Sequence, residues 1–302
     1  MSKYLLLSLL LITSPVLAKN GSDQCHLFFE NQKYKQALGY CLQASKQGYA
    51  SIQYNLGWMH DKGKGTPQDY QQAISWYTKA AKQGHARAQY HLGGIYDNGK
   101  GTPQDYKQAL SWYRQAANQG IALAQYKLGQ LYSNGEGVPQ DYKQAISWYS
   151  KAAKQGSATA QYHVGEMYNR GRGIPQDDQQ ALSWYSKAAT QGHAIAQYNA
   201  GAMYANGEGT PQNDKQALSW YSKAAKQGNA RAQNRLGKMH YKGQGTPKDY
   251  IVAHAWWNVA AAQGVESAEE SIRIIENSMS PSQVEEAQEL SKVFNSKYAG
   301  ND

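Results

Sequence analysis

The chain has 302 residues, of which 41% are hydrophobic and 18% are charged. Its 31 Lys and Arg residues exceed its 22 Asp and Glu residues, which gives a formal net charge of +9. A basic excess favours acidic partners, anionic membrane surfaces or cell-wall polymers. Because the basic residues are scattered along the chain, they are typical of a solvated basic surface, and the sequence does not predict nucleic-acid binding.

The first 18 residues have the pattern of an export signal. Lys3 gives a positive start, residues 4–12 form a short apolar run, and residues 16–18 provide small residues for cleavage. This order is typical of a secretory signal peptide, and the run is too short to span a bilayer. We therefore expect cleavage after Ala18 and a periplasmic or secreted protein without a transmembrane anchor.

A block of 36 residues then recurs with almost no drift. Evenly spaced glycines close the successive blocks, at Gly48, Gly84, Gly120, Gly156, Gly192, Gly228 and Gly264. A fixed period between about 20 and 50 residues is typical of a solenoid, in which each unit buries its apolar face against its neighbours. Such a fold favours an extended binding surface over a catalytic cleft.

Residues 85–120 illustrate one block. Apolar and small residues at helical spacing predict a first helix over 86–96. Gly99 can take a left-handed conformation and Pro103 cannot continue a helix, so a second helix is expected over 105–118. A tryptophan recurs in the second helix, which favours core packing over a ligand site. Its copies are Trp76, Trp112, Trp148, Trp184, Trp220 and Trp256.

The motif A-x-A-Q-Y-x-L-G-x-x-Y-x-x-G-x-G, followed by P-Q-D-Y-x-Q-A-x-S-W-Y-x-K-A-A, resembles the Sel-1-like repeat family, a relative of the tetratricopeptide repeat. The resemblance covers six full repeats over residues 50–264 and implies an all-α fold, a right-handed α-solenoid of helix hairpins. It also implies a non-catalytic adaptor or scaffold, which in exported bacterial members often serves envelope signalling or host interaction. The departures from the motif are Asn234, His60, His240 and the stretch 255–257, all in terminal repeats, where atypical units are expected.

Residues 19–49 align with a shortened capping hairpin that lacks the loop. The alignment places Cys25 at the position of Gly57 and Cys41 at that of Tyr77, and these positions face each other in a tetratricopeptide-like hairpin. In an oxidising compartment an even, closely spaced pair predicts a disulfide. Two buried free thiols are the alternative.

Residues 265–302 are expected to cap the other end. One helix is predicted over 265–277, with Ile272, Ile274 and Ile275 offering apolar contacts. The sequence 280–283 then has the pattern of a capped helix start. The residues of this last helix that can cover the final repeat are Val284, Ala287, Leu290, Val293 and Phe294, and residues 297–302 are expected to form a frayed tail.

Specificity is expected where the copies differ. Four variable places in each first helix are spaced by four, three and four residues, which puts them on one face. The resemblance implies that first helices line the concave surface, and a tyrosine ladder runs beside this face. The predicted partner-binding residues are Tyr54, Asn55, Trp58, Lys62, Arg87, Tyr90, His91, Asn98, Tyr126, Lys127, Asn134, Tyr162, His163, Arg170, Tyr198, Asn199, Asn206, Arg231, Arg235, Lys238 and Lys242.

A groove with tyrosines and amide or basic residues suits an extended peptide or a carboxylate-bearing segment. The strongest basic bias lies over 231–242, where an acidic segment is expected to dock. The alternative for the face is that its variable positions have drifted and that the tyrosines pack between helices. The alternative for the function is a cell-wall or glycan-associated factor that modulates a lytic enzyme.

Catalytic and cofactor motifs are not found. None of the eight histidines pairs with another at i,i+4 or forms H-E-x-x-H, so no metal site is expected. The chain has no G-x-S-x-G, and its Gly-x-Gly loops lead into Pro instead of a phosphate cradle. We therefore expect no enzyme and no cofactor. A hydrolase of the β-lactamase-like kind is a distant alternative, proposed for cysteine-rich relatives whose repeated Cys pairs this chain lacks.

Overall fold

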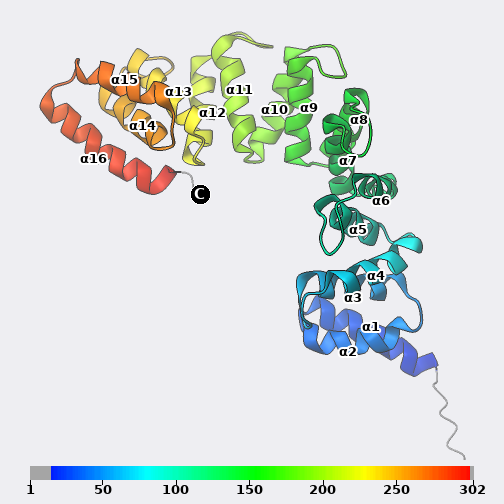
Figure 1. The fold of residues 1–302 in the computed structure, drawn as a ribbon. Coiled ribbons are helices and arrows are strands. Elements are labelled where there is room, and N and C mark those ends of the chain that lie inside the picture. Colours follow the sequence, from blue (N-terminus) through cyan, green and yellow to red (C-terminus); the bar gives the residue numbers. More distant parts are fainter. Residues whose placement is uncertain (1–14, 300–302) are drawn as a thin grey trace, which may run out of the picture. The chain divides into compact units, whose positions relative to one another are not determined.

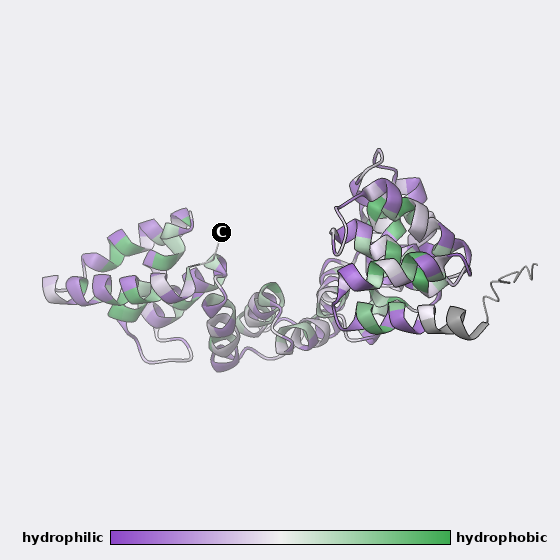
Figure 2. Ribbon diagram, turned by 90° about the horizontal axis from the view of Figure 1, so that it is seen from below, coloured by the Kyte–Doolittle hydropathy of each residue, from purple (hydrophilic) through white to green (hydrophobic). Residues whose placement is uncertain are grey.

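The computed structural model describes residues 15–299, and within them it contains sixteen helices and no strand (Figure 1). From α1 to α7 and from α8 to α15, each helix packs against the next one in the chain, which is the all-α repeat architecture that the sequence predicts. The chain divides after Gln140 into two compact units. Figure 2 shows hydrophobic and hydrophilic residues interspersed along the helices, as expected where one side of a helix packs on its neighbours.

The first unit begins with the capping hairpin and continues with the first repeats. Its helices are α1 (Pro15–Glu30), α2 (Tyr34–Ser45), α3 (Ala50–Lys62), α4 (Tyr70–Lys82), α5 (Ala86–Asn98), α6 (Tyr106–Asn118) and α7 (Ala122–Asn134). The signal peptide expected over residues 1–18 lies mostly outside the described residues, because these start at Pro15.

The second unit contains the remaining repeats and the C-terminal cap. Its helices are α8 (Tyr142–Lys154), α9 (Ala158–Arg170), α10 (Asp178–Thr190), α11 (Ala194–Asn206), α12 (Asp214–Lys226), α13 (Ala230–Lys242), α14 (Tyr250–Ala262), α15 (Glu266–Glu276) and α16 (Pro281–Tyr298). Below, the first helices are α3, α5, α7, α9, α11 and α13, and the second helices are α4, α6, α8, α10, α12 and α14.

The helices predicted from residues 85–120 are present with small shifts. The first helix, α5, continues two residues beyond its predicted end and stops at Gly99, whose φ of 65° is left-handed. The second helix, α6, starts after Asp105, whose carboxylate accepts a hydrogen bond from the backbone N–H of Gln108 at 3.0 Å. This cap satisfies one of the free amides at the start of the helix.

A glycine of the first helix lets the hairpins α3–α4, α5–α6, α9–α10 and α11–α12 close. A Cβ atom at Gly93 would lie 2.7 Å from Cδ1 of Tyr113. That distance is too short for any other residue, so the second-helix ring packs directly on the first-helix backbone. Three further pairs show the same contact, Gly57 with Tyr77, Gly165 with Tyr185 and Gly201 with Tyr221.

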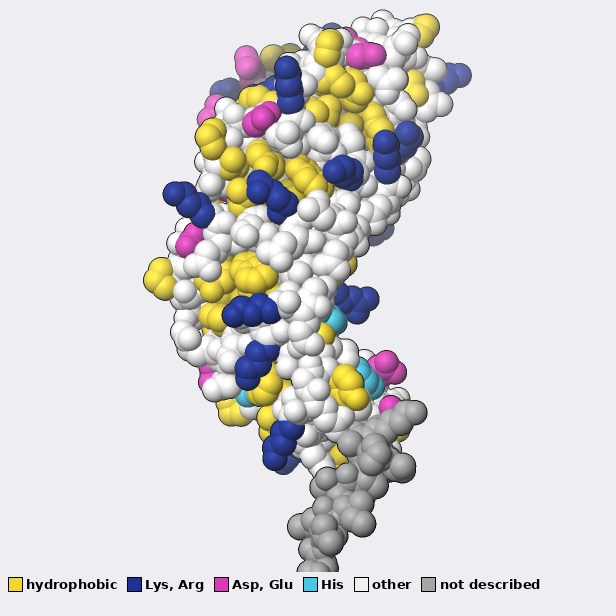
Figure 3. Space-filling view, turned by 90° about the vertical axis from the view of Figure 1, so that its right-hand side faces the viewer, with side chains coloured by type: hydrophobic (Ala, Val, Ile, Leu, Met, Phe, Trp, Pro, Cys, Tyr) yellow, Lys and Arg dark blue, Asp and Glu magenta, His cyan; other side chains and the backbone are white. Residues whose placement is uncertain are grey.

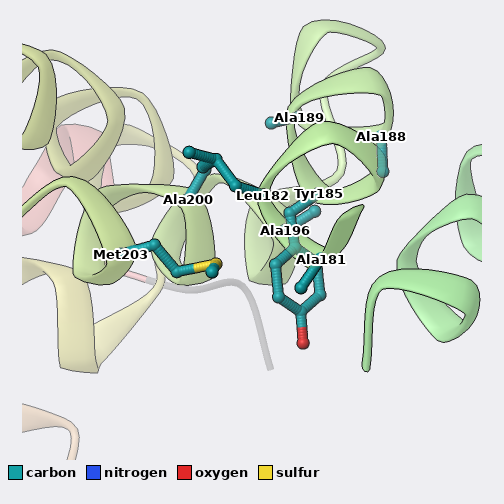
Figure 4. Close-up of a cluster of buried hydrophobic side chains, with 8 residues drawn as sticks. All are labelled: Ala181, Leu182, Tyr185, Ala188, Ala189, Ala196, Ala200 and Met203. Carbon is teal, nitrogen blue, oxygen red and sulfur yellow. The ribbon is translucent and has the colours of Figure 1, made fainter. Parts of the chain in front are cut away.

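Neighbouring hairpins share small apolar cores. In the cluster between α10 and α11, Leu182 and Met203 pack among alanines beside the ring of Tyr185 (Figure 4). A buried glutamine accompanies this core. The side-chain amide of Gln197 donates to the carbonyl of Ala189 at 3.0 Å, so this polar group is not left unpaired.

The predicted disulfide is confirmed. Cys25 of α1 and Cys41 of α2 are bonded, their Cα atoms are 4.8 Å apart, and both residues are fully buried. They occupy the places that Gly57 and Tyr77 occupy in the next hairpin. A covalent bond therefore replaces the glycine–ring contact where the terminal hairpin has a neighbour on only one side.

The C-terminal cap consists of two helices. The start of α16 has the predicted capping box between Ser280 and Gln283. Phe294 packs on Trp256 with ring centroids 4.5 Å apart, and α16 continues through Lys297 to Tyr298. The structure differs from expectation at Ile274 of α15 and Val293 of α16, which are 55% and 45% exposed.

Within residues 15–299, no helix has both the length and the apolar character that a membrane crossing requires.

Histidines cap two of the first helices. The Nδ1 atoms of His85 and His193 accept the backbone N–H groups of Ala88 and Ala196, each at 3.2 Å. An acceptor nitrogen must be unprotonated. Burial lowers the pKa of both histidines below 6.5, assisted by Arg87 near His85.

We expect the protein to lose stability as the pH falls below about 6.5, because the unfolded chain then binds protons that the folded histidines resist. In a His85→Asn/His193→Asn variant the loss of unfolding free energy between pH 7.5 and 5 should be smaller. Asn229 already caps α13 in the same way, so the variant keeps the cap. Urea unfolding at the two pH values measures the difference, and an identical loss in both proteins would contradict the prediction.

We expect reduction of the disulfide to lower the unfolding free energy by about 3 kcal/mol, the chain-entropy value for a loop of this size. Urea unfolding followed by circular dichroism measures the change. A Cys25→Gly/Cys41→Tyr variant restores the pair found in other repeats and should lose less than Cys25→Ala/Cys41→Ala. Equal stability of oxidised and reduced protein would show that the bond does not support the hairpin.

Candidate functional site

The tyrosines of the predicted ladder are half-buried and pack between helices. In the first unit, Tyr54 lies 5.9 Å from Tyr77 and stacks on His85 at 4.7 Å, between ring centroids. Tyr162 lies 5.9 Å from Tyr185 and stacks on His193 at 4.9 Å. Each ring thus joins its own hairpin to the next, as the packing interpretation predicts, and leaves only part of its surface on the first-helix face. The other ladder residues, Tyr90, Tyr126 and Tyr198, are also half-buried.

In the first unit, α1 covers one end of the predicted face. Asn55 is only 5% exposed, and its amide lies 3.4 Å from Nδ1 of His26. Trp58 packs on Phe29 and Tyr34. These contacts belong to the capping hairpin, so Asn55 is inaccessible and Trp58 is only partly accessible.

The remaining predicted residues of the first unit line two hollows on α3, α5 and α7. A hollow of about 210 Å³ is lined by Lys62, Tyr90, His91, Asn98 and Lys127, and one of about 240 Å³ by Asn98, Lys127 and Asn134. Arg87 is exposed beside them.

Two of the three lysines that line these hollows are paired with carboxylates, and the third, Lys100, lies 6.0 Å from the ring centroid of Tyr70. Lys62 pairs with Asp61 at 2.9 Å, and Lys127 pairs with Asp97 at 3.4 Å. Burial lowers the pKa of His91 to about 4, so this histidine is neutral at pH 7. Of the lysines that line the hollows of the first unit, only Lys100 is therefore without a carboxylate partner among the described residues.

In the second unit, α9 and α11 form a small hollow of about 150 Å³. Its lining includes Tyr162, Glu166, Arg170 and Asn199. Arg170 pairs with Glu166 at 3.2 Å, and the hydrogen bond from His163 holds the pKa of this carboxyl below its usual range, with help from Arg170. At the end of α11, the amide of Asn206 donates to Glu208 at 2.9 Å.

A larger hollow lies between α11, α13 and α15 and has a volume of about 630 Å³. We call it the C-terminal pocket. It brings together the four basic residues that the sequence singled out, Arg231, Arg235, Lys238 and Lys242, and no acidic residue lines it. Within residues 15–299, none of the four forms an ion pair.

Eight further residues complete this pocket. They are Tyr198, Asn234, Tyr241, Trp257, Val265, Ser267, Ser271 and Ile274. Of these, Tyr198 had been predicted as a ladder residue, whereas Asn234 and Trp257 had been interpreted only as departures at a terminal repeat. The sequence did contain a signal for this pocket. Asn234 and Trp257 are 23 residues apart, and residues at this spacing face each other in one hairpin.

Lysines of the second helices contact aromatic rings. Lysine ammonium groups lie over tryptophan rings, at 4.0 Å for Lys79 on Trp76 and 4.0 Å for Lys187 on Trp184. Figure 3 shows a face on which Lys and Arg side chains are spaced apart among hydrophobic patches. This face is basic without forming one cluster.

Comparison with known proteins agrees with this repeat architecture. The sequence profile of the Sel1 repeat matches residues 30–49, 50–85, 86–121, 122–157, 158–193, 194–229 and 230–265. No curated protein matches the chain.

Two solved structures are similar. A Sel1 repeat protein from Oxalobacter formigenes is 34% identical over 80% of this chain and 96% of its own, with a TM-score of 0.68. The protective antigen c5321 of uropathogenic Escherichia coli, which has an SLR fold, is 33% identical over 93% of this chain, with a TM-score of 0.80. The chain spans 62% of the length of that antigen. The chain belongs to the Sel1 repeat family, whose members are generally scaffolds for protein–protein interaction.

Proposed function

We propose that this protein is an exported, non-catalytic scaffold that binds a peptide segment of an envelope, regulatory or host protein on its first-helix face. The observation that carries the proposal is the position of the hollows described above. Those on α3, α5 and α7, and those on α9, α11 and α13, are lined by the residues that vary between otherwise constant repeats. Variable chemistry on a constant frame is the expected form of a specific binding surface.

Export is supported by the disulfide and by the signal-like N-terminus. A buried bond between Cys25 and Cys41 is stable in an oxidising compartment such as the periplasm or the exterior. The E. coli relative is described as a protective antigen, which favours a role outside the cytoplasm for this chain too.

The histidines have structural contacts that support a scaffold instead of an enzyme. His85 and His193 cap helices. His254 is 1% exposed, and its ring nitrogens lie 2.8 Å from Glu276 and 2.8 Å from Asn258, which ties α14 to α15.

Site-specific photo-crosslinking in the native compartment tests the proposal. A photoreactive residue replaces Arg87, Arg170 or Lys242 on the first helices, and Lys79 or Lys187 on the second helices serves as the matched control. We expect crosslinks to a protein from the first-helix positions, at least about tenfold more abundant than from the controls, because a bound segment contacts only one face.

Equal crosslinking from both sets would contradict the proposed face. Crosslinks to peptidoglycan or glycan without protein would instead support the cell-wall factor, which the basic surface also allows.

A further inference from the structure

The last repeat lacks one ring of the tyrosine ladder. In earlier repeats the ladder tyrosine rests on the second-helix tyrosine, as Tyr198 does on Tyr221 at 5.7 Å between centroids. In the last repeat, Asn234 stands at the ladder position and Trp257 at the second-helix position. The short amide side chain leaves the first-helix side of the indole without its usual aromatic partner.

The following helix does not fill this space. Around Tyr54, the next repeat supplies the rings of His85 and His91, at 4.7 and 5.8 Å. The residues that correspond to these two, five periods later, are Val265 and Ser271, which are much smaller. Asn234 itself is held by a hydrogen bond to Ser267 Oγ at 3.1 Å. Part of the C-terminal pocket therefore corresponds to the volume that the rings of Tyr54, His85 and His91 occupy in the first repeat.

The last repeat also lacks a carboxylate at a position where the first two repeats have one. The three repeats between them lack it too, with Ser133, Asn169 and Ala205. Asp61 and Asp97 stand at one repeat position in the first unit, where they pair with Lys62 and Lys127. In the last repeat this position is Tyr241. The positive charges of α13 consequently have no acidic group beside them in the pocket, whereas lysines on α3 and α7 do.

We propose that the C-terminal pocket binds an acidic peptide segment that carries an aromatic side chain. The ring takes the place of the missing ladder tyrosine against Trp257, and flanking carboxylates pair with Arg235 and Lys238. The inference rests on the proposed function and names the chemistry of its partner. Charge complementarity commits the site to an anionic segment, because four cations without an acid repel one another until an anion enters.

The pocket has the other properties that such a segment needs. Trp257 Nε1 donates to the carbonyl of Asn234 at 3.2 Å, which fixes the indole, and the 4% of this residue that is exposed forms part of the pocket wall. Tyr241 lies beside this indole at 5.8 Å, and Ile274, which is 55% exposed, adds an apolar rim. A volume of 630 Å³ is within the usual range for ligand sites and exceeds that of one aromatic ring, so neighbouring residues of the segment also fit.

Selection from a random peptide library on the full chain tests the inference. We expect enrichment of sequences with a Trp, Tyr or Phe beside Asp and Glu. In fluorescence anisotropy, a selected peptide should bind the Asn234→Tyr variant at least about tenfold more weakly, because the new ring fills the space that the ligand needs. Asn234→Tyr restores the residue of other repeats, so its melting temperature should not fall.

Charge variants give an independent measurement. Arg235→Gln/Lys238→Gln should weaken the same peptide and flatten the salt dependence of its affinity, because two ion pairs are lost. Lys187→Gln/Lys223→Gln removes two cations from second helices and should leave the affinity unchanged.

Three outcomes would overturn the inference. They are a selection without acidic–aromatic enrichment, an Asn234→Tyr variant that binds as tightly as the original chain, and equal binding of a peptide whose aromatic residue is replaced by Ala. Photo-crosslinks that persist on the first-helix face of Asn234→Tyr would then show that the proposed scaffold function stands without this pocket. Absence of crosslinks in the original chain would remove the scaffold function itself.

Discussion

The close contact between a glycine of the first helix and a ring of the second helix is the constraint on which each hairpin depends. Gly57, Gly93, Gly165 and Gly201 all lie under a tyrosine ring with no room for a side chain. In the first and last hairpins, other residues take the places of this glycine and this tyrosine. A disulfide replaces it at Cys25 and Cys41, and an indole replaces the phenol where Trp257 lies on Gly237.

Much of this fold could be predicted because each local sequence pattern, such as a helix end or a loop, occurs in several copies. The helix limits and the pairing of Cys25 with Cys41 could be predicted from position within a 36-residue block, and the capping box at Ser280 from the local pattern of residues 280–283. The surface was harder to predict. Whether Asn55 is covered by α1, or Lys127 is neutralised by Asp97, depends on contacts between blocks, and the period of one block does not contain that information.

The C-terminal pocket also depends on contacts that the period of one block does not predict. Its four basic residues were predicted from their common helix face, since a spacing of four, three and four residues fixes that face. The cavity was not predicted, because it does not result from Asn234 alone. It depends also on the absent tyrosine ring, on the helix that follows and on the indole of Trp257. A departure from the repeat pattern therefore indicates a pocket only when the surrounding residues do not fill the space that it leaves.

The two ends of the stack are closed by unlike means. The first hairpin is covalently joined, whereas the last is held by the rings of Trp256, Phe294 and Tyr298 and by the bond from Gln233 to the carbonyl of Tyr298 at 2.8 Å. Because a solenoid opens from its termini, local unfolding begins where no covalent bond opposes it. Amide hydrogens of α15 and α16 then exchange before those of α1 and α2, and a partner seated between α13 and α15 slows exchange first at the end that opens most readily.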